Sequence, residues 1–430
     1  MTQNPIHWFR HSLPYINTHR GKTFVIMMGS ETVNSPNFTT ITQDIALLHS
    51  LGIRLVLVHG ARHEIDATLA NTSIASGFYD GVRITSDTAI THVVSAVANV
   101  RTNIESRFCG GLSNTPLHGS KITTISGNFI TAKPFGVRDG VDYLLTGEVR
   151  RVDKHAISHN LSQGHLVIIS PLGFSSTGEL YNLEAFDVAK CVAIALNADK
   201  LIIFNQEQGV FVKGKLIKEM TVSQAMSHRT IHPALPNAIS ACQAGVSRVH
   251  LLSHHDDGAL LKELFTTDGY GTMISQNPFD AIRYATPDDV MGIMSLIKPL
   301  EEQGILVARS RERLEEEIEF FCVIERDGKI LGCAGLYPLD NDSAEIASVA
   351  IDPNYRDGNR GADLLKFVET WCLSQGRHRL FALTTRTLHW FLERGFCETT
   401  PNSLPPKRHQ AWHNGRNSKV LLKKLGDHLV

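Results

Sequence analysis

The sequence contains no long hydrophobic run and no excess of charge of either sign. Its longest apolar stretches are about five to seven residues, whereas a bilayer-spanning helix needs about 18–20. The 42 Lys and Arg residues balance 43 Asp and Glu residues, so no basic surface for nucleic acid or an anionic membrane is indicated. The first residues show no secretory signal pattern. We therefore expect a cytoplasmic, metabolite-handling protein with neither nucleic acid nor a membrane as partner.

The chain also lacks the cysteine and histidine spacings of metal and redox sites. Its seven cysteines are widely separated, with no Cys-x-x-Cys pair, which predicts reduced and mostly buried thiols. The 21 histidines are scattered and never adopt metal-ligand spacing. We expect no bound metal.

A length of 430 residues suggests two or three folding units. Residues 22–275 alternate apolar runs of strand length with helical patterns, which predicts an α/β domain with a parallel sheet between helices. The predicted strands are residues 23–28, 54–58, 121–125, 166–170, 200–204 and 248–252.

The alternation breaks near residues 277–283, which predicts a boundary between residues 1–280 and 281–430. The second unit has its own mixed pattern. Its predicted strands are 282–285, 321–326, 331–336, 345–351 and 379–384, and its predicted helices are 288–299, 310–319, 361–375 and 387–394.

A polar turn between a β-branched strand and an amphipathic helix is the sharpest local feature of the second unit. A helix N-terminus after such a turn presents unpaired N–H groups that suit a pyrophosphate, and two arginines add positive charge. The alternative is an ordinary strand–turn–helix connection. The residues assigned to this phosphate site are Val349, Ala350, Ile351, Arg356, Asp357, Gly358, Asn359, Arg360 and Gly361.

This turn and the order of elements resemble the acetyl-CoA site of the GNAT acetyltransferases. Asn359 occupies a position where that family has glycine, and Asn tolerates a left-handed backbone. Residues 282–425 further resemble the acetyltransferase domain of the bacterial N-acetylglutamate synthases, through blocks 299–307, 309–314, 380–396 and 416–421. The resemblance implies acetyl-CoA as co-substrate and L-glutamate as acceptor.

Acetyl transfer from a thioester needs a base, an oxyanion donor and a proton source for the thiolate. Glu345 stands where the family has its base, the alternative being a solvated strand-end carboxylate. The resemblance implies that the N–H groups of residues 348–350 polarise the thioester carbonyl. Three candidates remain open for the proton source: Ser418, Thr384 and His389.

A dicarboxylic acceptor requires separated cations, and the arginine fork binds a carboxylate through two nitrogens. The candidates are Arg309, Arg408 and Arg416, with Lys407 as an alternative to Arg408. Each could instead be a solvated surface residue. The family blocks also assign Leu306 and Ser348 to the substrate site.

The first unit resembles the amino-acid kinase fold, closest to N-acetylglutamate kinases. The matching blocks are 13–29, 51–62, 81–85, 126–131, 146–151 and 170–182. Active kinases carry a lysine in the first glycine turn and an aspartate in an Asn-Ala-Asp segment, where this chain has Met27 and Phe186. Because phosphoryl transfer depends on charge stabilisation, we expect a binding module without kinase activity.

The ligand that the resemblance implies for this module is L-arginine, acting as a feedback effector. Glu263 is the candidate partner of its guanidinium. An ordinary turn before a final strand is the alternative for this segment. The residues assigned to the arginine site are Tyr15, Glu263, Gly269, Gly271 and Thr272.

The two resemblances together imply an enzyme that makes N-acetyl-L-glutamate in the first step of arginine biosynthesis. Three rivals are a genuine amino-acid kinase, an arginine-sensing protein with weak or lost acetyltransferase activity, and an acetyltransferase for other amines. The resemblance also implies a homohexamer in which an N-terminal helix over residues 5–19 joins subunits.

Overall fold

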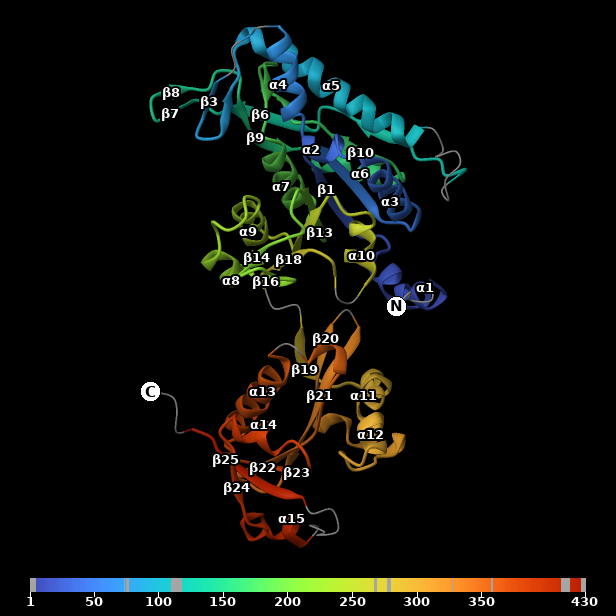
Figure 1. Ribbon diagram of the computed structural model, residues 1–430, viewed down its shortest axis with the longest axis vertical. Helices are drawn as coiled ribbons and strands as arrows, with labels where there is room; N and C mark the ends of the chain where they lie inside the picture. Colours follow the sequence, from blue (N-terminus) through green and yellow to red (C-terminus); the bar gives the residue numbers. More distant parts are fainter. Residues whose placement is uncertain are drawn as a thin grey trace. The chain divides into compact units, whose positions relative to one another are not determined.

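The computed structural model describes residues 5–72, 74, 77–109, 118–266, 269–276, 280–326, 328–356, 359–410 and 418–426. The chain divides into two compact units, Met1–Pro278 and Phe279–Val430. Figure 1 colours the first unit from blue to yellow and the second from dark yellow to red. Each unit is built around its own β-sheet.

The first unit is centred on an eight-stranded sheet whose described neighbours are parallel except for β17 and β18. Both faces are covered, so its inner strands read as continuous apolar runs. The strand order is β16 (Glu219–Thr221), β18 (Thr272–Ser275), β17 (Arg248–Ser253), β13 (Lys200–Asn205), β1 (Thr23–Met28), β2 (Arg54–His59), β10 (Leu166–Ile169) and β5 (Thr124–Ser126).

Alternate residues of these strands enter two hydrophobic cores. In β1, Val25 faces one core while Phe24 and Ile26 face the other. The first core is closed by α6 (Lys154–Ser162), α7 (Ala185–Ala195), α8 (Val222–Ser227) and α9 (Leu235–Gln243). The second is closed by α3 (Phe38–Ser50), α4 (Arg62–Asn71), α5 (Asp87–Cys109) and α10 (Ala259–Phe265), with α1 (Pro5–His19) against α10 and α2 (Ser30–Val33) after β1.

A second, four-stranded sheet and three short hairpins were not predicted from the sequence. Their strands are short and partly exposed, so they lack a continuous apolar signal. The sheet orders β12 (Leu180–Asn182), β11 (Leu172–Phe174), β6 (Ile130–Pro134) and β9 (Gly147–Val152). The hairpins are β3 (Gly77–Tyr79) with β4 (Val82–Ile84), β7 (Val137–Arg138) with β8 (Val141–Asp142), and β14 (Phe211–Val212) with β15 (Lys215–Leu216).

The second unit contains a seven-stranded sheet in which β22 and β23 form the parallel pair among otherwise antiparallel described neighbours. The order is β19 (Ala281–Tyr284), β20 (Phe321–Arg326), β21 (Lys329–Pro338), β22 (Ser343–Ile351), β23 (Arg379–Thr384), β25 (Lys419–Lys424) and β24 (Cys397–Thr399).

Helices cover both faces of this sheet, as the packing clusters and Figure 1 indicate. On one face lie α13 (Arg360–Ser374) and α14 (Leu388–Leu392), and on the other α11 (Val290–Glu302) and α12 (Arg311–Glu316). The five-residue α15 (Pro406–Gln410) precedes β25 in the chain, and the 3₁₀ turns are Pro287–Asp289, Ile318–Phe320, Pro353–Tyr355 and Pro401–Ser403.

Three predicted helices in this unit differ from the structure by two or more residues at one or both ends, and one of them, expected over 387–394, is α14, which ends at Leu392. The helix expected over 288–299 begins after a Thr286–Asp289 capping box and continues through Pro299 to Glu302. The helix expected over 310–319 begins after the Ser310 cap but ends at Glu316, and a 3₁₀ turn follows.

Candidate functional site

Strands β22 and β23 pair over only four residues of β22, from Ser343 to Ile346. Beyond this point β22 continues to Ile351, with its described ladder on the β21 side alone. A bulge interrupts that ladder, and within it Ser348 has a left-handed backbone with φ of 52°. The end of β22 therefore has backbone groups on the β23 side that no described strand pairs.

Arg309, just before α12, reaches this bulge. Its Nη1 donates to Ser348 Oγ at 2.5 Å, its Nη2 donates to the Tyr337 hydroxyl at 3.4 Å, and its Nε lies 3.5 Å from Glu317 Oε2. The Tyr337 hydroxyl in turn donates to Glu317 at 2.7 Å. These contacts fix the direction of the Arg309 guanidinium from three sides.

The protonation states of this cluster follow from its contacts. Burial, together with the hydrogen bond to Glu317, raises the pKa of Tyr337, so its hydroxyl stays protonated. Burial alone would raise the pKa of Glu317, but hydrogen bonds from Arg313 and Tyr337 outweigh it and lower that pKa. The cluster therefore holds a charged guanidinium against a charged carboxylate and a neutral phenol.

Glu345 is the third residue of β22, and it is buried at 7% exposure. Arg408 of α15 binds it through two nitrogens: Nε donates to Oε2 at 2.5 Å and Nη2 donates to Oε1 at 3.0 Å. This hydrogen bond raises the pKa of Arg408. A solvated strand-end carboxylate therefore does not describe Glu345, whose carboxylate lies against a predicted substrate-binding arginine.

The predicted base and both described arginines of the substrate site share one face of the sheet. Tyr337 and Glu345 are direct partners across β21 and β22, so their side chains project to the same face. The strand neighbours of Glu345 pack on the α13 side, which directs Glu345 to the opposite face. Leu306 packs half-buried in the core of α11 and α12 on that opposite face.

The three candidates for the proton source have different surroundings. Thr384 is buried at the end of β23, and its hydroxyl bonds that of Thr387 at 2.7 Å. Because Thr384 pairs with Lys419, the half-buried Ser418 lies at the same end of the sheet. His389 is exposed on α14. The carboxyl ends of parallel strands meet at one edge, so Thr384 lies at the same edge as the end of β22.

The predicted phosphate turn leads directly into α13. Asn359 precedes the helix with φ of −76°, so the turn does not need a left-handed backbone at this position. Arg356 is exposed, with its Nε donating to the carbonyl of Ile351 at 3.4 Å. Val349 and Ala350 pack into the two cores of the unit. Asp357 and Gly358 lie outside the described residues, as does Arg416.

The other two residues assigned to the turn have structural contacts. Arg360 donates to Asp280 at 2.6 Å and to the carbonyl of Tyr355 at 3.2 Å. A Cβ on Gly361 would lie 3.0 Å from the Trp390 ring, so glycine permits a close approach of α13 to that ring. Arg360 and Gly361 therefore both lie against other residues of the second unit.

Cysteine chemistry is disfavoured near the bulge. Cys333 is fully buried, its Sγ lies 3.6 Å from the carbonyl of Ser348, and burial raises its pKa to about 12. Burial has the same effect on Cys322 and Cys372. These thiols stay protonated at neutral pH, and the thiolate is the nucleophilic form. All seven cysteines are free, and four are buried.

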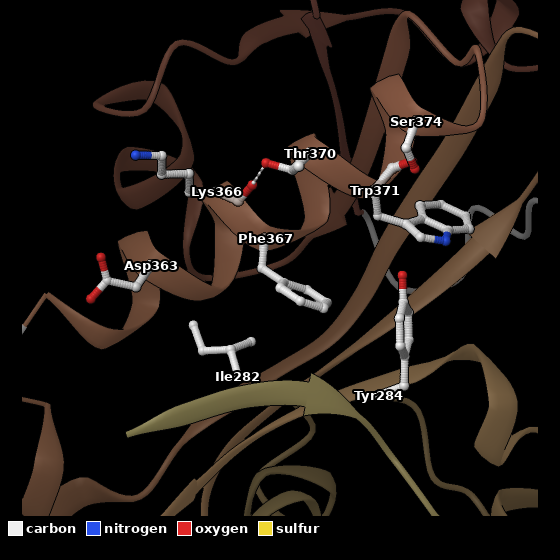
Figure 2. Close-up of a pocket in the computed structure, with 8 residues that line it drawn as sticks. All are labelled: Ile282, Tyr284, Asp363, Lys366, Phe367, Thr370, Trp371 and Ser374. Atoms are coloured by element: carbon white, nitrogen blue, oxygen red, sulfur yellow. Dashed lines mark hydrogen bonds between the residues drawn. The ribbon is translucent and has the colours of Figure 1, made fainter. Parts of the chain in front are cut away.

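A separate hollow of about 390 Å³ lies on the α13 side of the sheet. Figure 2 shows Tyr284 rising from β19 towards Phe367 and Trp371 on α13, with the rings of Tyr284 and Phe367 5.5 Å apart. No residue assigned from the sequence lines it. The lining residues are Ile282, Tyr284, Asp363, Lys366, Phe367, Thr370, Trp371 and Ser374.

In the first unit, two glycine turns meet at the carboxyl ends of β1 and β2. A Cβ on Gly60 would lie 3.0 Å from the backbone nitrogen of Ser30, so the two turns are in close contact. Met27 provides no cation here, and Ser30 donates to the carboxylate of Glu64. Phe186 is a residue of α7 and is buried in the first hydrophobic core. The kinase-like positions therefore carry neither the lysine nor the aspartate.

Glu263 of α10 is the centre of a buried polar chain in this unit. Its Oε2 accepts from the backbone N–H groups of Tyr270 and Gly271 at 2.6 and 2.9 Å, and its Oε1 accepts from His250 Nδ1 at 2.5 Å. His250 Nε2 lies 3.3 Å from Lys200 Nζ. This series of polar contacts therefore runs from the Lys200 ammonium through the neutral His250 imidazole to the Glu263 carboxylate.

The pKa values support this protonation pattern. Burial, together with the charge of Lys200, lowers the pKa of His250 to about 4. Burial alone would raise the pKa of Glu263, but the bonds from His250, Tyr270 and Gly271 lower it to about 2. Glu263 is therefore ionised and His250 neutral at pH 7.

The other residues assigned to the arginine site have separate surroundings. Gly269 has φ of 60° and its Cβ position lies 3.0 Å from Glu263 Oε2. Thr272 is fully buried, donating to the carbonyl of Ile217 and accepting from the N–H of Val210. Tyr15 of α1 packs half-buried against the second core.

Four residues of these sites were not predicted. His250 had a sequence signal, because it is a polar residue inside the apolar run of β17. Lys200, Tyr337 and Glu317 had none, since their partners are distant in sequence or on other elements.

Among the described helices, none has both the length and the apolar character required to traverse a lipid bilayer.

The family models match both units. Residues 22–253 match the amino acid kinase family and residues 290–396 match the acetyltransferase (GNAT) family. The fold is therefore an amino-acid kinase fold followed by a GNAT acetyltransferase domain, as the sequence predicted.

Relatives that align along nearly the full length of the chain show which acetyltransferase family it belongs to. Amino-acid acetyltransferases of Azotobacter vinelandii and of Ectopseudomonas mendocina are each 47% identical to the chain, over 98% and 97% of it and 99% of each relative. The chain belongs to this amino-acid acetyltransferase family, so it is an acyltransferase.

Two solved structures of N-acetylglutamate synthase from Neisseria gonorrhoeae are similar as well, each 36% identical. The complex with coenzyme A and L-arginine has a TM-score of 0.88 over 98% of this chain and 100% of that one. The complex with coenzyme A and N-acetyl-glutamate has a TM-score of 0.63 over 99% of this chain and 100% of that one.

Proposed function

We propose that this enzyme transfers the acetyl group of acetyl-CoA to the amino group of L-glutamate, giving N-acetyl-L-glutamate and CoA. The observation that carries the proposal is the presence of two arginines, Arg309 and Arg408, on the sheet face that bears the buried carboxylate of Glu345. The 36% identity to a synthase solved with coenzyme A and N-acetyl-glutamate supports the same substrates.

Arg309 and Arg408 supply separate cations for the two carboxylates of the acceptor. Both use a planar fork, which binds a carboxylate through two parallel hydrogen bonds. Arg309 is already oriented by Ser348 and Tyr337. Arg416 remains a predicted third cation of this site, and Leu306 is the predicted apolar neighbour of the acceptor.

Glu345 acts as the base in this proposal. It takes a proton from the acceptor ammonium, directly or through a water, so that the neutral amine attacks the thioester carbonyl. The N–H groups of residues 348–350 stabilise the oxygen that becomes negative. The C–S bond then breaks, and Thr384 or Ser418 gives a proton to the thiolate.

The residues present fit acetyl-CoA. The β23 side of the β22 end has no described ladder partner, which suits the extended, amide-containing arm of the co-substrate. The turn before α13 suits the pyrophosphate, with Arg356 as its exposed cation. Direct transfer is favoured because the nearby Cys333 is a protonated, buried thiol.

The first unit acts as a regulatory module in this proposal, binding L-arginine as the feedback effector of arginine biosynthesis. Glu263 is the candidate partner of the arginine guanidinium, and the support for this ligand is that the related synthase was solved with L-arginine. A homohexamer joined through α1 is proposed with it. Light scattering that gives a monomer mass would refute the hexamer.

A steady-state assay of CoA thiol release tests the proposal. Acetyl-CoA with L-glutamate should release thiol, and added L-arginine should change the rate. No release with glutamate would refute the synthase and leave the alternative, an arginine-sensing protein with weak or lost activity. Calorimetry with arginine and with acetyl-CoA separates that alternative from an inactive preparation.

A further inference from the structure

The ion pair between Arg408 and Glu345 joins two groups that the reaction needs apart. One guanidinium occupies both oxygens of the carboxylate, at 2.5 and 3.0 Å. The Glu345 side chain is 9% exposed and the Arg408 side chain 27% exposed. The base is therefore covered, while the arginine that covers it is reachable from solvent.

From this geometry we infer that Arg408 is a specificity-determining residue that releases the base only to a dicarboxylic acceptor. The side-chain carboxylate of the acceptor replaces Glu345 on the guanidinium, and Glu345 is then free to take the proton of the acceptor ammonium. This inference rests on the proposed function and adds a coupling between acceptor recognition and base release.

Exchange of one carboxylate for another keeps the guanidinium paired throughout. A neutral acceptor side chain offers no replacement, so freeing Glu345 would leave an uncompensated charge at a buried position, which is strongly unfavourable. Selectivity for glutamate over glutamine would then appear in kcat as well as in KM, because glutamine leaves the base covered.

Arg408 is well placed for such an exchange. It lies on a helix of only five residues, and Glu345 is the acidic side chain it contacts within the described part of the chain. Arg309, in contrast, is held at 12% side-chain exposure by Ser348, Tyr337 and Glu317. One arginine is therefore fixed in advance and the other exchanges partners.

The test compares glutamate and glutamine as acceptors in the full-length enzyme and in Arg408→Met, with His409→Ala as the control. His409 is exposed on the same short helix. Arg408→Met should raise the KM for glutamate and abolish the kcat preference for glutamate over glutamine, because no guanidinium then covers the base with either acceptor. His409→Ala should change neither constant. A kcat preference for glutamate over glutamine that persists in Arg408→Met would overturn the inference.

A second measurement needs no variant and covers the case in which Arg408→Met does not fold. Acetate added to the wild-type enzyme with L-2-aminobutyrate supplies the missing carboxylate separately. Acetate should increase kcat for this truncated acceptor in a saturable way, and an equal concentration of chloride should not. Absence of stimulation would overturn the inference. Failure of the proposed function is distinguishable, since the wild-type enzyme would then release no thiol with glutamate.

Discussion

The hydroxyl of Ser348 accepts a hydrogen bond from the Arg309 guanidinium at 2.5 Å, and Ser348 is the residue that adopts a left-handed backbone at the β22 bulge. It is the one non-glycine residue with positive φ among the described residues of the second unit. A serine at such a position is strained by about 1–2 kcal/mol relative to glycine. Its hydroxyl, which glycine would lack, orients Arg309.

Substitutions of Ser348 separate this role from the strain. Ser348→Ala and Ser348→Gly both remove the hydroxyl, so each should raise the KM for glutamate several-fold with a smaller change in kcat. Glycine also relieves the strain, so Ser348→Gly should be more stable than Ser348→Ala by about 1 kcal/mol in urea unfolding. Equal stability of the two variants would contradict a strained backbone.

Tyr337→Phe removes one hydroxyl that bridges Arg309 and Glu317 without removing the ring. We expect a stability loss of about 1 kcal/mol, typical of one hydrogen bond, and a higher KM for glutamate because Arg309 is less firmly oriented. The KM for acetyl-CoA should not change. A change confined to acetyl-CoA would show that Tyr337 acts elsewhere.

Glu345→Gln keeps the size of the side chain but removes the base. We expect kcat to fall by roughly 10²-fold or more, while calorimetry still detects acetyl-CoA binding. Glu317→Gln is the matched control, since it removes a half-buried carboxylate from the same face and should affect mainly KM. Similar kcat values for Glu345→Gln and wild type would exclude Glu345 as the base.

The stability of the first unit should depend on pH through His250 and Glu263. The folded-state pKa of His250 is lowered to about 4, below the 6.5 of the unfolded chain, so the unfolded state binds more protons between these values. Stability is then complete above about pH 6.5 and falls towards pH 4, by up to about 1.4 kcal/mol per pH unit.

The Glu263 carboxylate affects the folding stability at lower pH than His250 does. Its folded-state pKa is about 2 against a usual 4.5, so its contribution is present above pH 4.5 and lost as pH falls towards 2. Urea unfolding of wild type and His250→Gln at pH 7, 6 and 5 tests the histidine. The difference in unfolding free energy should shrink as pH falls, and a constant difference would contradict a buried neutral imidazole.

Gly271→Ala should disrupt the turn that binds Glu263. A Cβ there would lie 2.0 Å from the carbonyl oxygen of Leu251, so the backbone must shift and the N–H groups of residues 270 and 271 must move away from the carboxylate. We expect a stability loss of about 1–3 kcal/mol and loss of the arginine response. A normal arginine response in this variant would remove the turn from the effector site.

The strands buried on both faces were predictable from the sequence. The continuous apolar run of β1 gave residues 23–28, which are the observed bounds, and β20 and β23 were also predicted within their observed limits. The sheet containing β6 was missed, because β6 buries only Ile130 and Ala132 and ends in the exposed residues Lys133 and Pro134.

The candidate site was predictable as a set of residues but not as a set of contacts. Glu345 and Arg408 are 63 positions apart, and their pairing depends on where α15 is folded against the sheet. The burial of Glu345 likewise depends on the residues of other elements that cover β22. The residue types in the sequence indicate which chemistry is available. Which side chains pair with one another is known only once the fold is known.

The parallel pairing of β22 with β23 has a topological consequence. An antiparallel pair can be closed by a two-residue hairpin, but a parallel pair requires the chain to cross over, and here α13 forms that crossover. The described β22–β23 ladder ends at Ile346, and the crossover connection places the N-terminus of α13 after the carboxyl end of β22. The proposed pyrophosphate turn and the proposed slot for the extended arm of acetyl-CoA therefore lie on the two sides of one strand-to-helix connection.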